Sequence, residues 1–513
     1  MAASALVLPP TTPPTYHKIV SETLTIPTDT QKPIPVGLLA CQRDPLLREL
    51  VSQVISCTLS QSQPLSAAEK RARKGKAEAP KDSLVEVILH DTILFPEGGG
   101  QPHDIGLLTT SDGELWDVVD VKRHGGHAVH YVKVKDNNTD AALASFATGT
   151  NVGVALGDHG LQRRLDHMCM HTSQHLLSAV LETRLNLPTL SWSMTAYPTP
   201  SYVEIPRAMT LEEITLIQEE ANRFVFEGRR VHIEVEELDP EGVPEIAKTE
   251  SGRAVGKGLP TDYTGGVKRT VIIDGVDRNP CCGTHLPSLN NLQLFLLPHM
   301  EGLSRAATSS ARLYFLSGPR LITYLTSTHN SLTAASLTLS CGAPLVPERV
   351  QQVVDDRRKA TKRVDDLEKE LAENIAAGLV SSVRENQGSS SVSGTYLRRQ
   401  RIDDSPNPLA FLSLIASEFT TKLAESNIVT PTILLLSSSP SVQTSTSTTV
   451  VLVSGSDATT VKEVGDVLKT KLGVKGGGKG TKWSGKFTGV WKVSREGSTV
   501  DELGRGLYRA ISV

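Results

Sequence analysis

Two short motifs rich in histidine and cysteine, far apart in the chain, constrain its fold more than any other feature of the sequence. The first is His171-Thr-Ser-Gln-His175, and the second is Cys281-Cys-Gly-Thr-His285. Side chains four positions apart lie on the same face of a helix. Neutral imidazole and thiolate are the ligands that zinc prefers in proteins. We therefore predict one tetrahedral zinc site, formed only on folding, with His171, His175, Cys281 and His285 as its ligands.

Each motif leaves one alternative ligand open. His167 lies four residues before the first histidine of its motif, so it could bind the metal or lie just outside the site. Cys282 competes with Cys281, although the four-residue spacing to the histidine of the same motif favours Cys281. Zinc proteases need a glutamate directly after the first histidine as general base. Thr172 occupies that position here, which excludes this class of enzyme.

Length and charge limit what else the chain can be. With 513 residues it is long enough for about three domains. The formal net charge of -3 excludes a globally basic nucleic-acid binder but leaves room for a basic patch. Six cysteines are too few for a disulfide framework, and no apolar run is long enough for a membrane span. We expect a soluble, cytoplasmic protein that binds neither a membrane nor DNA.

The first part of the sequence predicts a small β-barrel within an α+β protein. We expect a flexible segment at 1–34 and a barrel domain at 35–158, which begins with a strand and a helix within 35–57. Short strands separated by turns are expected at 84–89, 116–121, 127–134 and 151–156. Residues 61–82 contain almost no large apolar side chains, so we expect a disordered insertion there.

A zinc-binding α+β domain is expected at 159–320. Residues 161–186, which carry the first motif, have apolar residues and histidines at helical spacing. A second helix is expected at 210–227, because Thr210 followed by Glu213 matches a capping box. Strands follow this helix in the sequence, which completes an α+β arrangement around the metal site.

The last third of the chain predicts a helical linker and a terminal α/β domain. Residues 321–385 are expected to be helical, because apolar residues recur near heptad spacing between 346 and 383. This pattern leaves open an intramolecular helix, a dimer, and an interaction protein built on the coiled coil. A polar linker at 387–405 and an α/β domain at 406–513, with a Gly/Lys loop at 473–489, complete the prediction.

Several segments together resemble a known family. They are Cys41-Gln-Arg-Asp44, Phe95-Pro-Glu-Gly-Gly-Gly-Gln-Pro102, Arg164-Leu-Asp-His-Met168 and the two metal motifs. In this order they resemble the AlaX-type stand-alone alanyl-tRNA editing proteins, in particular the long eukaryotic form, over roughly residues 35–320. The C-terminal third is similar to the terminal domain of alanyl-tRNA synthetase, but no segment resembles its aminoacylation domain. Residues 61–82 and 253–258 depart from the family pattern, which we expect to affect tRNA docking rather than chemistry.

The resemblance implies a zinc-dependent aminoacyl-tRNA deacylase. The family hydrolyses tRNA(Ala) mischarged with serine or glycine, at the ester between the amino acid and the terminal ribose. Four protein ligands close a zinc site, whereas catalytic zinc usually keeps one position open. We therefore expect the substrate to displace Cys281 or one histidine; alternatively, zinc only orients the substrate and a tRNA hydroxyl activates water. A zinc-stabilised tRNA- or partner-binding module without hydrolysis also remains open.

Three sets of residues are candidates for contact with the substrate. Backbone can approach a ligand closely at glycines, so the candidates for the acceptor end are Gly98, Gly99, Gly100 and Gln101. The candidates for reading the hydroxyl of serine, around Trp192, are Thr189, Ser191 and Ser193, although an ordinary polar strand is the alternative. Gln174 is a candidate catalytic residue, and Asp277 could support a metal ligand. Lys475–Phe487 interleaves cations, glycines and aromatics, as RNA-binding segments do.

Overall fold

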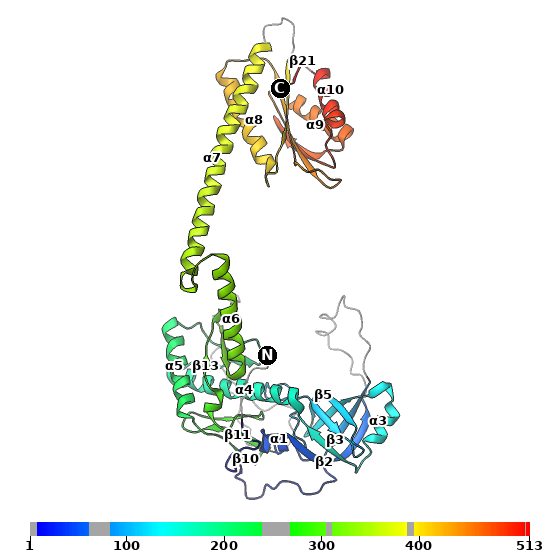
Figure 1. Cartoon of the computed structure of the whole chain (residues 1–513), viewed down its shortest axis with the longest axis vertical. Helices are drawn as coiled ribbons and strands as arrows, with labels where there is room; N and C mark the ends of the chain where they lie inside the picture. The colour runs from blue at the N-terminus through cyan, green and yellow to red at the C-terminus, as the bar shows by residue number, and fades with distance from the viewer. Residues whose placement is uncertain are drawn as a thin grey trace. The chain divides into compact units, whose positions relative to one another are not determined.

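The computed structural model describes residues 8–60, 83–238, 267–303, 310–386, 394–507 and 509–512. The expected insertion at 61–82 and the segment 253–258 lie outside these residues. The chain divides into two compact units, 1–334 and 335–513, each with apolar core of its own (Figure 1). The predicted α+β class is confirmed. No helix in the described ranges combines the length and apolarity needed to cross a membrane.

A closed β-barrel occupies the first part of unit 1, as the spacing of the short strands predicted. Its strands are β2 (Glu49–Leu59), β3 (Leu84–Leu89), β4 (Gly106–Thr109), β5 (Leu115–His124), β6 (His127–Lys133) and β7 (Asn151–Ala155), joined in the order β2-β3-β6-β5-β4-β7. Alternate side chains point inward, so Val85, Val87, Trp116 and Val118 are buried. The short helices η1 (Lys135–Asn137) and α3 (Thr139–Ser145) join β6 to β7.

Strand β2 corrects the prediction for 35–57, where we expected a helix. The only helix there is the single turn α1 (Ala40–Arg43), and the apolar residues that suggested helical spacing lie in β2. Val54 faces the barrel interior and is fully buried, whereas Val51 is 73% exposed. A helix-like spacing of apolar residues was therefore accidental, and pairing with β3 and β7 decided the conformation.

The N-terminal segment, expected to be flexible, is anchored in its described part. Strand β1 (His17–Ile19) pairs in parallel with β10 (Val231–Glu237), and Tyr16 and Ile34 are buried. The 1–34 prediction is therefore wrong for these residues. No periodic pattern marks this strand in the sequence, because three residues are too few to show periodicity.

The middle of the chain forms two sheets and two long helices. The helices are α4 (Gly157–Leu185) and α5 (Leu211–Glu227), and Thr210 and Glu213 form the predicted capping box. One sheet has the order β1-β10-β11-β12, in which β11 is Val267–Ile273 and β12 is Asp277–Pro280. The other has the order β13-β15-β9-β8, with β14 beside β15. Its strands are β8 (Ser191–Ser193), β9 (Ser201–Ile205), β13 (Phe295–Leu296), β14 (Met300–Gly302) and β15 (Ala311–Ser317), and η2 (Leu289–Leu292) precedes β13.

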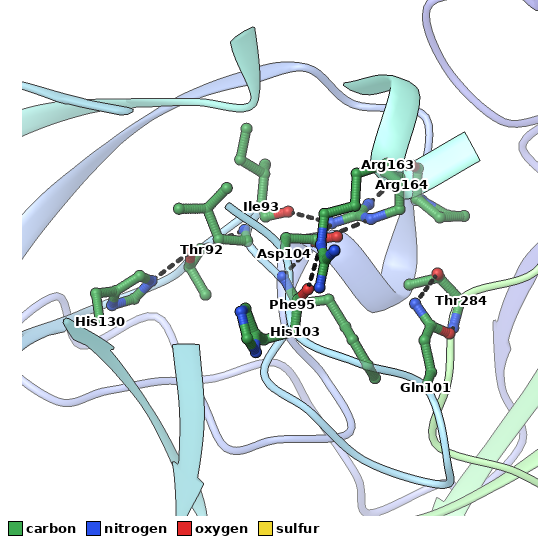
Figure 2. Close-up of polar contacts among 12 residues, drawn as sticks. Thr92, Ile93, Phe95, Gln101, His103, Asp104, His130, Arg163, Arg164 and Thr284 are labelled. Atoms are coloured by element: carbon green, nitrogen blue, oxygen red, sulfur yellow. Dashed lines mark hydrogen bonds and ion pairs between the residues drawn. The ribbon is translucent and has the colours of Figure 1, made fainter. Parts of the chain in front are cut away.

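Buried ion pairs fix α4 against its surroundings. Arg164 on α4 is fully buried and pairs with Asp104 (Figure 2). Asp104 follows Gly98, Gly99 and Gly100, which we call the glycine loop of the barrel. The same guanidinium donates to the carbonyl oxygen of Ile93 at 2.6 Å. Asp166, also on α4, pairs with buried Arg320 at 2.7 Å. The helix that carries the first metal motif is therefore held in register with the barrel.

The C-terminal third has one six-stranded sheet in the order β19-β20-β18-β17-β16-β21. Its strands are β16 (Thr395–Ile402), β17 (Thr432–Ser439), β18 (Thr448–Gly455), β19 (Lys475–Lys479), β20 (Lys482–Thr488) and β21 (Arg509–Ser512). The helices are α6 (Gly318–Thr338), which crosses the division between the units, η3 (Ala343–Leu345), α7 (Val346–Asn386), α8 (Pro408–Glu425), α9 (Ala458–Leu472), η4 (Val493–Gly497) and α10 (Ser498–Leu507). The α/β pattern predicted for this part is present.

Two predictions in this part need correction. The expected linker at 387–405 contains β16, an inner strand of the sheet, so the α/β fold begins before residue 406. The expected Gly/Lys loop at 473–489 is mostly the hairpin of β19 and β20. Glycine is disfavoured in strands, but a Cβ on Gly476 would lie 2.2 Å from the carbonyl oxygen of Ser484, so close packing requires glycine there.

Candidate metal centre

The fold brings the two predicted motifs together. His171 and His175 lie one turn apart on α4, and Cys281 and His285 lie in the loop that follows β12. One nitrogen or sulfur atom from each of these four residues lies within 4.8 Å of the others, and we call the four residues the metal group. Cys281 Sγ is 3.3 Å from His171 Nε2 and 3.4 Å from His285 Nε2. A tetrahedral zinc site has S···N edges of about 3.5 Å, as follows from its bond lengths, so this donor set fits zinc.

Hydrogen bonds orient the imidazoles toward the centre of the group. His171 Nδ1 lies 2.9 Å from Gln101 Oε1, and His175 Nδ1 lies 2.9 Å from Asp277 Oδ2. Acceptors at Nδ1 place the proton there and leave Nε2 of each ring to bind a metal. The contact predicted for Asp277 is present. Arg278, the next residue in the chain, instead pairs with Glu234 at 2.8 Å.

Burial and mutual contacts shift the ionisation of the four donors. Burial raises the pKa of Cys281, but the interactions of its sulfur with His171 and His285 and hydrogen bonds from the imidazoles of His171 and His175 outweigh this effect, so the pKa of Cys281 lies well below its usual value. Burial lowers the pKa of His285 to about 3, which keeps it neutral. Burial also lowers the pKa of His175, but bonds to Asp277 and Cys281 outweigh it and raise the pKa to about 10. Metal binding would therefore release a proton from this group.

Gln101 is bound entirely to protein groups. Its Oε1 accepts from His171 and, at 3.0 Å, from the backbone N–H of Thr284. Its Nε2 donates to Thr284 Oγ1 at 2.8 Å, as Figure 2 shows. The side chain is 1% exposed. We predicted a substrate contact for Gln101, but the structure places it between the two metal motifs.

The glycine loop of the barrel packs against the cysteine motif. A Cβ on Gly99 would lie 2.9 Å from Cys282 Sγ, and φ at Gly99 is +61°. A Cβ on Gly283 would lie 2.2 Å from His171 Cε1. Both glycines are therefore required by close approach. Gly98 and Gly99 are half-buried at this contact, whereas Gly100 is exposed beside it.

The candidates for reading the serine hydroxyl separate into two groups. Ser191 and Ser193 lie on the opposite face of β8 from Trp192. The centroids of the Trp192 and His171 rings are 4.9 Å apart. The face of β8 that carries Trp192 is therefore the one nearer the metal group. Ser191 donates to Glu204 at 3.0 Å. The structure therefore places both serines away from the metal group.

Thr189, which follows α4 in the chain, hydrogen-bonds to polar side chains on that helix. Its Oγ1 lies 2.7 Å from Ser178 Oγ, which accepts from Gln174 Nε2 at 2.9 Å. Gln174 directly precedes His175, and Ser178 follows His175 within one turn of the helix. The sequence analysis did not name Ser178 as a site residue. Its place one helical turn after His175 could have indicated that it lies on the same side of α4.

The two alternative ligands lie outside the metal group. Burial lowers the pKa of His167 to about 2, and its Nδ1 has no hydrogen-bond partner in the described part of the chain. Burial raises the pKa of Cys282 to about 12, and its Sγ packs against the glycine loop. The spacing argument that favoured Cys281 over Cys282 agrees with this geometry.

Side chains from distant segments hold the cysteine loop, and the sequence did not identify them. Arg269 donates to the carbonyl oxygens of Cys281 at 3.2 Å and of Gly283 at 2.9 Å. Gln42 Nε2 donates to the carbonyl oxygen of Cys282 at 2.8 Å. Tyr16 donates its hydroxyl to the carbonyl oxygen of His285 at 2.9 Å. Side chains from three segments therefore hold the backbone of this loop, as hydrogen bonds behind the ligands do in metal sites.

Comparison with known proteins assigns the chain to a family. No protein-family model matches it. It is 31% identical over 481 residues to the putative alanyl-tRNA editing protein alaX of Saccharomyces cerevisiae. The alignment covers 89% of this chain and 94% of the yeast protein. The chain belongs to the alanyl-tRNA editing protein family. The resemblance drawn from the motifs is confirmed.

Further relatives mark out the shared regions. The alanyl-tRNA editing protein Aarsd1 of Mus musculus is 32% identical over 342 residues, 67% of this chain and 74% of that protein. The alanine–tRNA ligase of Pyrococcus furiosus is 28% identical over 306 residues, 58% of this chain but 30% of the ligase. This member of the editing family therefore shares only a limited part of the ligase.

Proposed function

We propose that the chain is a trans-editing hydrolase that removes serine or glycine from mischarged tRNA(Ala). The observation that carries this proposal is the cluster of His171, His175, Cys281 and His285 in a member of the editing family. When bound there, zinc would polarise the ester carbonyl or an attacking water. The surrounding residues of the protein would hold the four donor side chains in place, shield them from solvent and orient the acceptor end of the tRNA.

We further propose that the substrate opens the site. Four protein donors complete a tetrahedron, whereas catalytic sites keep a position free. Cys281 or one histidine would therefore yield to the substrate. Cys281 is half-buried, whereas the other three members of the group are buried. Its side chain is therefore the most accessible of the four to an incoming substrate.

The chain of Thr189, Ser178 and Gln174 supports selection of serine. Hydroxyl groups both donate and accept, so this chain can rearrange to bond the serine hydroxyl. An alanyl ester has no hydroxyl to bond to this chain and forgoes that hydrogen bond, which contributes about 0.5–1.5 kcal/mol net. Such a site would hydrolyse seryl-tRNA(Ala) in preference to alanyl-tRNA(Ala).

Gly98, Gly99 and Gly100 are proposed to receive the acceptor end. Gly100 is exposed and directly follows Gly99, which packs against Cys282. In the C-terminal hairpin, Lys475, Lys479, Lys482 and Lys486 are exposed and would add phosphate contacts. Trp483, expected to stack on bases, is instead a buried core residue. Only the electrostatic part of that prediction is therefore carried forward.

The deciding experiment measures deacylation of tRNA(Ala) charged separately with labelled serine, glycine and alanine. The wild-type chain is compared with Cys281→Ala and with the control Cys341→Ala, which removes a thiol outside the metal group. We expect loss of serine and glycine, sparing of alanine, and at least about a hundredfold lower rate in Cys281→Ala only.

The second candidate is a zinc-stabilised tRNA-binding module without hydrolysis. It predicts that the zinc-loaded wild type binds tRNA(Ala) in a filter assay and leaves all three esters intact. That result would overturn the hydrolase. A purely structural zinc would also make the metal-free protein unfold rather than only lose activity.

A further inference from the structure

The long helix α7 leaves one end without a partner in unit 2. Its C-terminal part packs against α8 through buried Ala372, Ala376, Leu379 and Val383. Its first part, from Val346 to Leu371, is almost entirely exposed. Six apolar side chains of this part are between 39% and 53% exposed: Val350, Val353, Val354, Val364, Leu367 and Leu371. An apolar stripe of this kind on a helix normally packs against another helix or sheet.

Most of this stripe follows a coiled-coil repeat. Residues alternately four and three positions apart form a single seam: Val346, Val350, Val353, Arg357, Ala360, Val364, Leu367 and Leu371. This alternation is the a and d spacing of two-stranded coiled coils. The seam ends where α7 meets α8, since the next position is Asn374. We call residues 346–371 the free segment of α7.

We propose that the free segment binds the free segment of a second copy of this chain, in an antiparallel coiled coil. In antiparallel pairs, a positions of one helix face d positions of the other. One register satisfies every apolar layer: Val346 faces Leu371, Val350 faces Leu367, and Val353 faces Val364. The centre then lies between Arg357 and Ala360, where the small alanine leaves space for the aliphatic stem of arginine.

Charges beside the seam specify the same register. The g positions are Arg349, Asp356, Arg363 and Glu370. In an antiparallel coiled coil g positions face g positions, and side chains lean toward the N-terminus of their own helix. The register above therefore pairs Arg349 with Glu370, and Asp356 with Arg363, of the other copy. Twofold symmetry produces each pair twice.

The other arrangements are less favourable. A parallel pair in register places Arg357 against Arg357 in the seam and leaves a single type of g–e ion pair, Arg363 with Glu368. An antiparallel pair shifted by one heptad places Arg363 against Arg363 and Asp356 against Glu370. Like charges at such sites are destabilising.

The first test is the mass of the full-length chain in solution, by light scattering and sedimentation. We expect a dimer for the wild type and a monomer for Val364→Glu, because the charge enters two layers. Lys369→Gln changes the net charge by the same amount on the outer face and should remain dimeric. Because Val364 is 53% exposed, the variant keeps its helix by circular dichroism. A monomeric wild type at tens of micromolar would overturn the proposal.

The second test exchanges a proposed ion pair. Arg349→Glu and Glu370→Arg should each weaken the dimer about tenfold, because each creates two like-charge contacts. The double variant should return to about the wild-type dissociation constant. A dimer whose double variant is no tighter than the single variants would overturn the antiparallel register. An intramolecular cover of the free segment by unit 1 predicts monomers throughout.

Discussion

Gln101 is the residue whose role depends most on the fold. From the sequence it belonged with the glycines as a substrate contact. In the structure its amide oxygen accepts from His171 and from the backbone of Thr284, so it joins one ligand of the first motif to the loop of the second. A buried amide with all its partners in place holds geometry rather than binding a ligand. We therefore propose that Gln101 is a positioning residue.

Replacement of Gln101 tests that role. Gln101→Ala should weaken zinc binding about 10- to 100-fold, because His171 loses its Nδ1 acceptor. Gln101→Glu keeps an acceptor at the same place and should recover most of the affinity. Competition with a chromophoric chelator measures the dissociation constant, and Glu97→Ala, exposed in the same loop, is the control. Equal affinity in Gln101→Ala and the wild type would exclude the role.

Helix α4 is the element that positions the site, and its contacts to the barrel are ionic and buried. Asp104 pairs with Arg164 on α4 and also accepts from the backbone N–H of Phe95 at 2.7 Å. Because Phe95 and Asp104 flank the glycine loop, these contacts hold both ends of the loop against α4. Figure 2 shows these groups converging between the barrel and α4. Loss of one member would leave a buried charge without a counter-ion, which is far more costly than loss of a surface pair.

Asp104→Asn should therefore lower the free energy of unfolding by about 3–5 kcal/mol. The matched control is Glu227→Gln, which removes exposed pairs with Arg223 and Arg229 and should cost less than about 1 kcal/mol. Urea unfolding followed by tryptophan fluorescence measures both changes. A loss of less than 1 kcal/mol in Asp104→Asn, on the order of a surface pair, would show that the pair does not hold the barrel to α4.

The whole molecule consists of two units with separate cores, and all four metal donors lie in unit 1. Binding to the folded state alone stabilises it by about 4 kcal/mol at a thousand times the dissociation constant. Metal should therefore stabilise unit 1 and leave unit 2 unchanged.

Chelation of the zinc-loaded full chain should lower the melting temperature of one calorimetric transition and leave the other in place. In Cys281→Ala the same transition should already lie at the lower temperature, while Cys341→Ala should behave as the wild type. A shift of both transitions together would mean that the units unfold as one. Absence of any shift would contradict a zinc site in unit 1.

The sequence determined which four residues could form a metal site, the barrel and the helices of regular period. His171, His175, Cys281 and His285 could be singled out because their chemistry and spacing are local properties of the chain, and the fold brings them into one group. The capping box at Thr210 and the length of α7 were predictable for the same reason. The barrel was predicted from the spacing of its short strands, although β2 was mistaken for a helix.

Only the tertiary structure decided which partner each ambiguous residue meets. Gln101 and Arg269 acquire their roles from groups far away in the sequence, and β2 and β16 are strands because neighbouring strands satisfy their backbone hydrogen bonds. Long-range pairing leaves no periodic signal in a short segment, so propensity alone misassigned them. The sequence carries the chemistry of the site, and the fold selects its geometry.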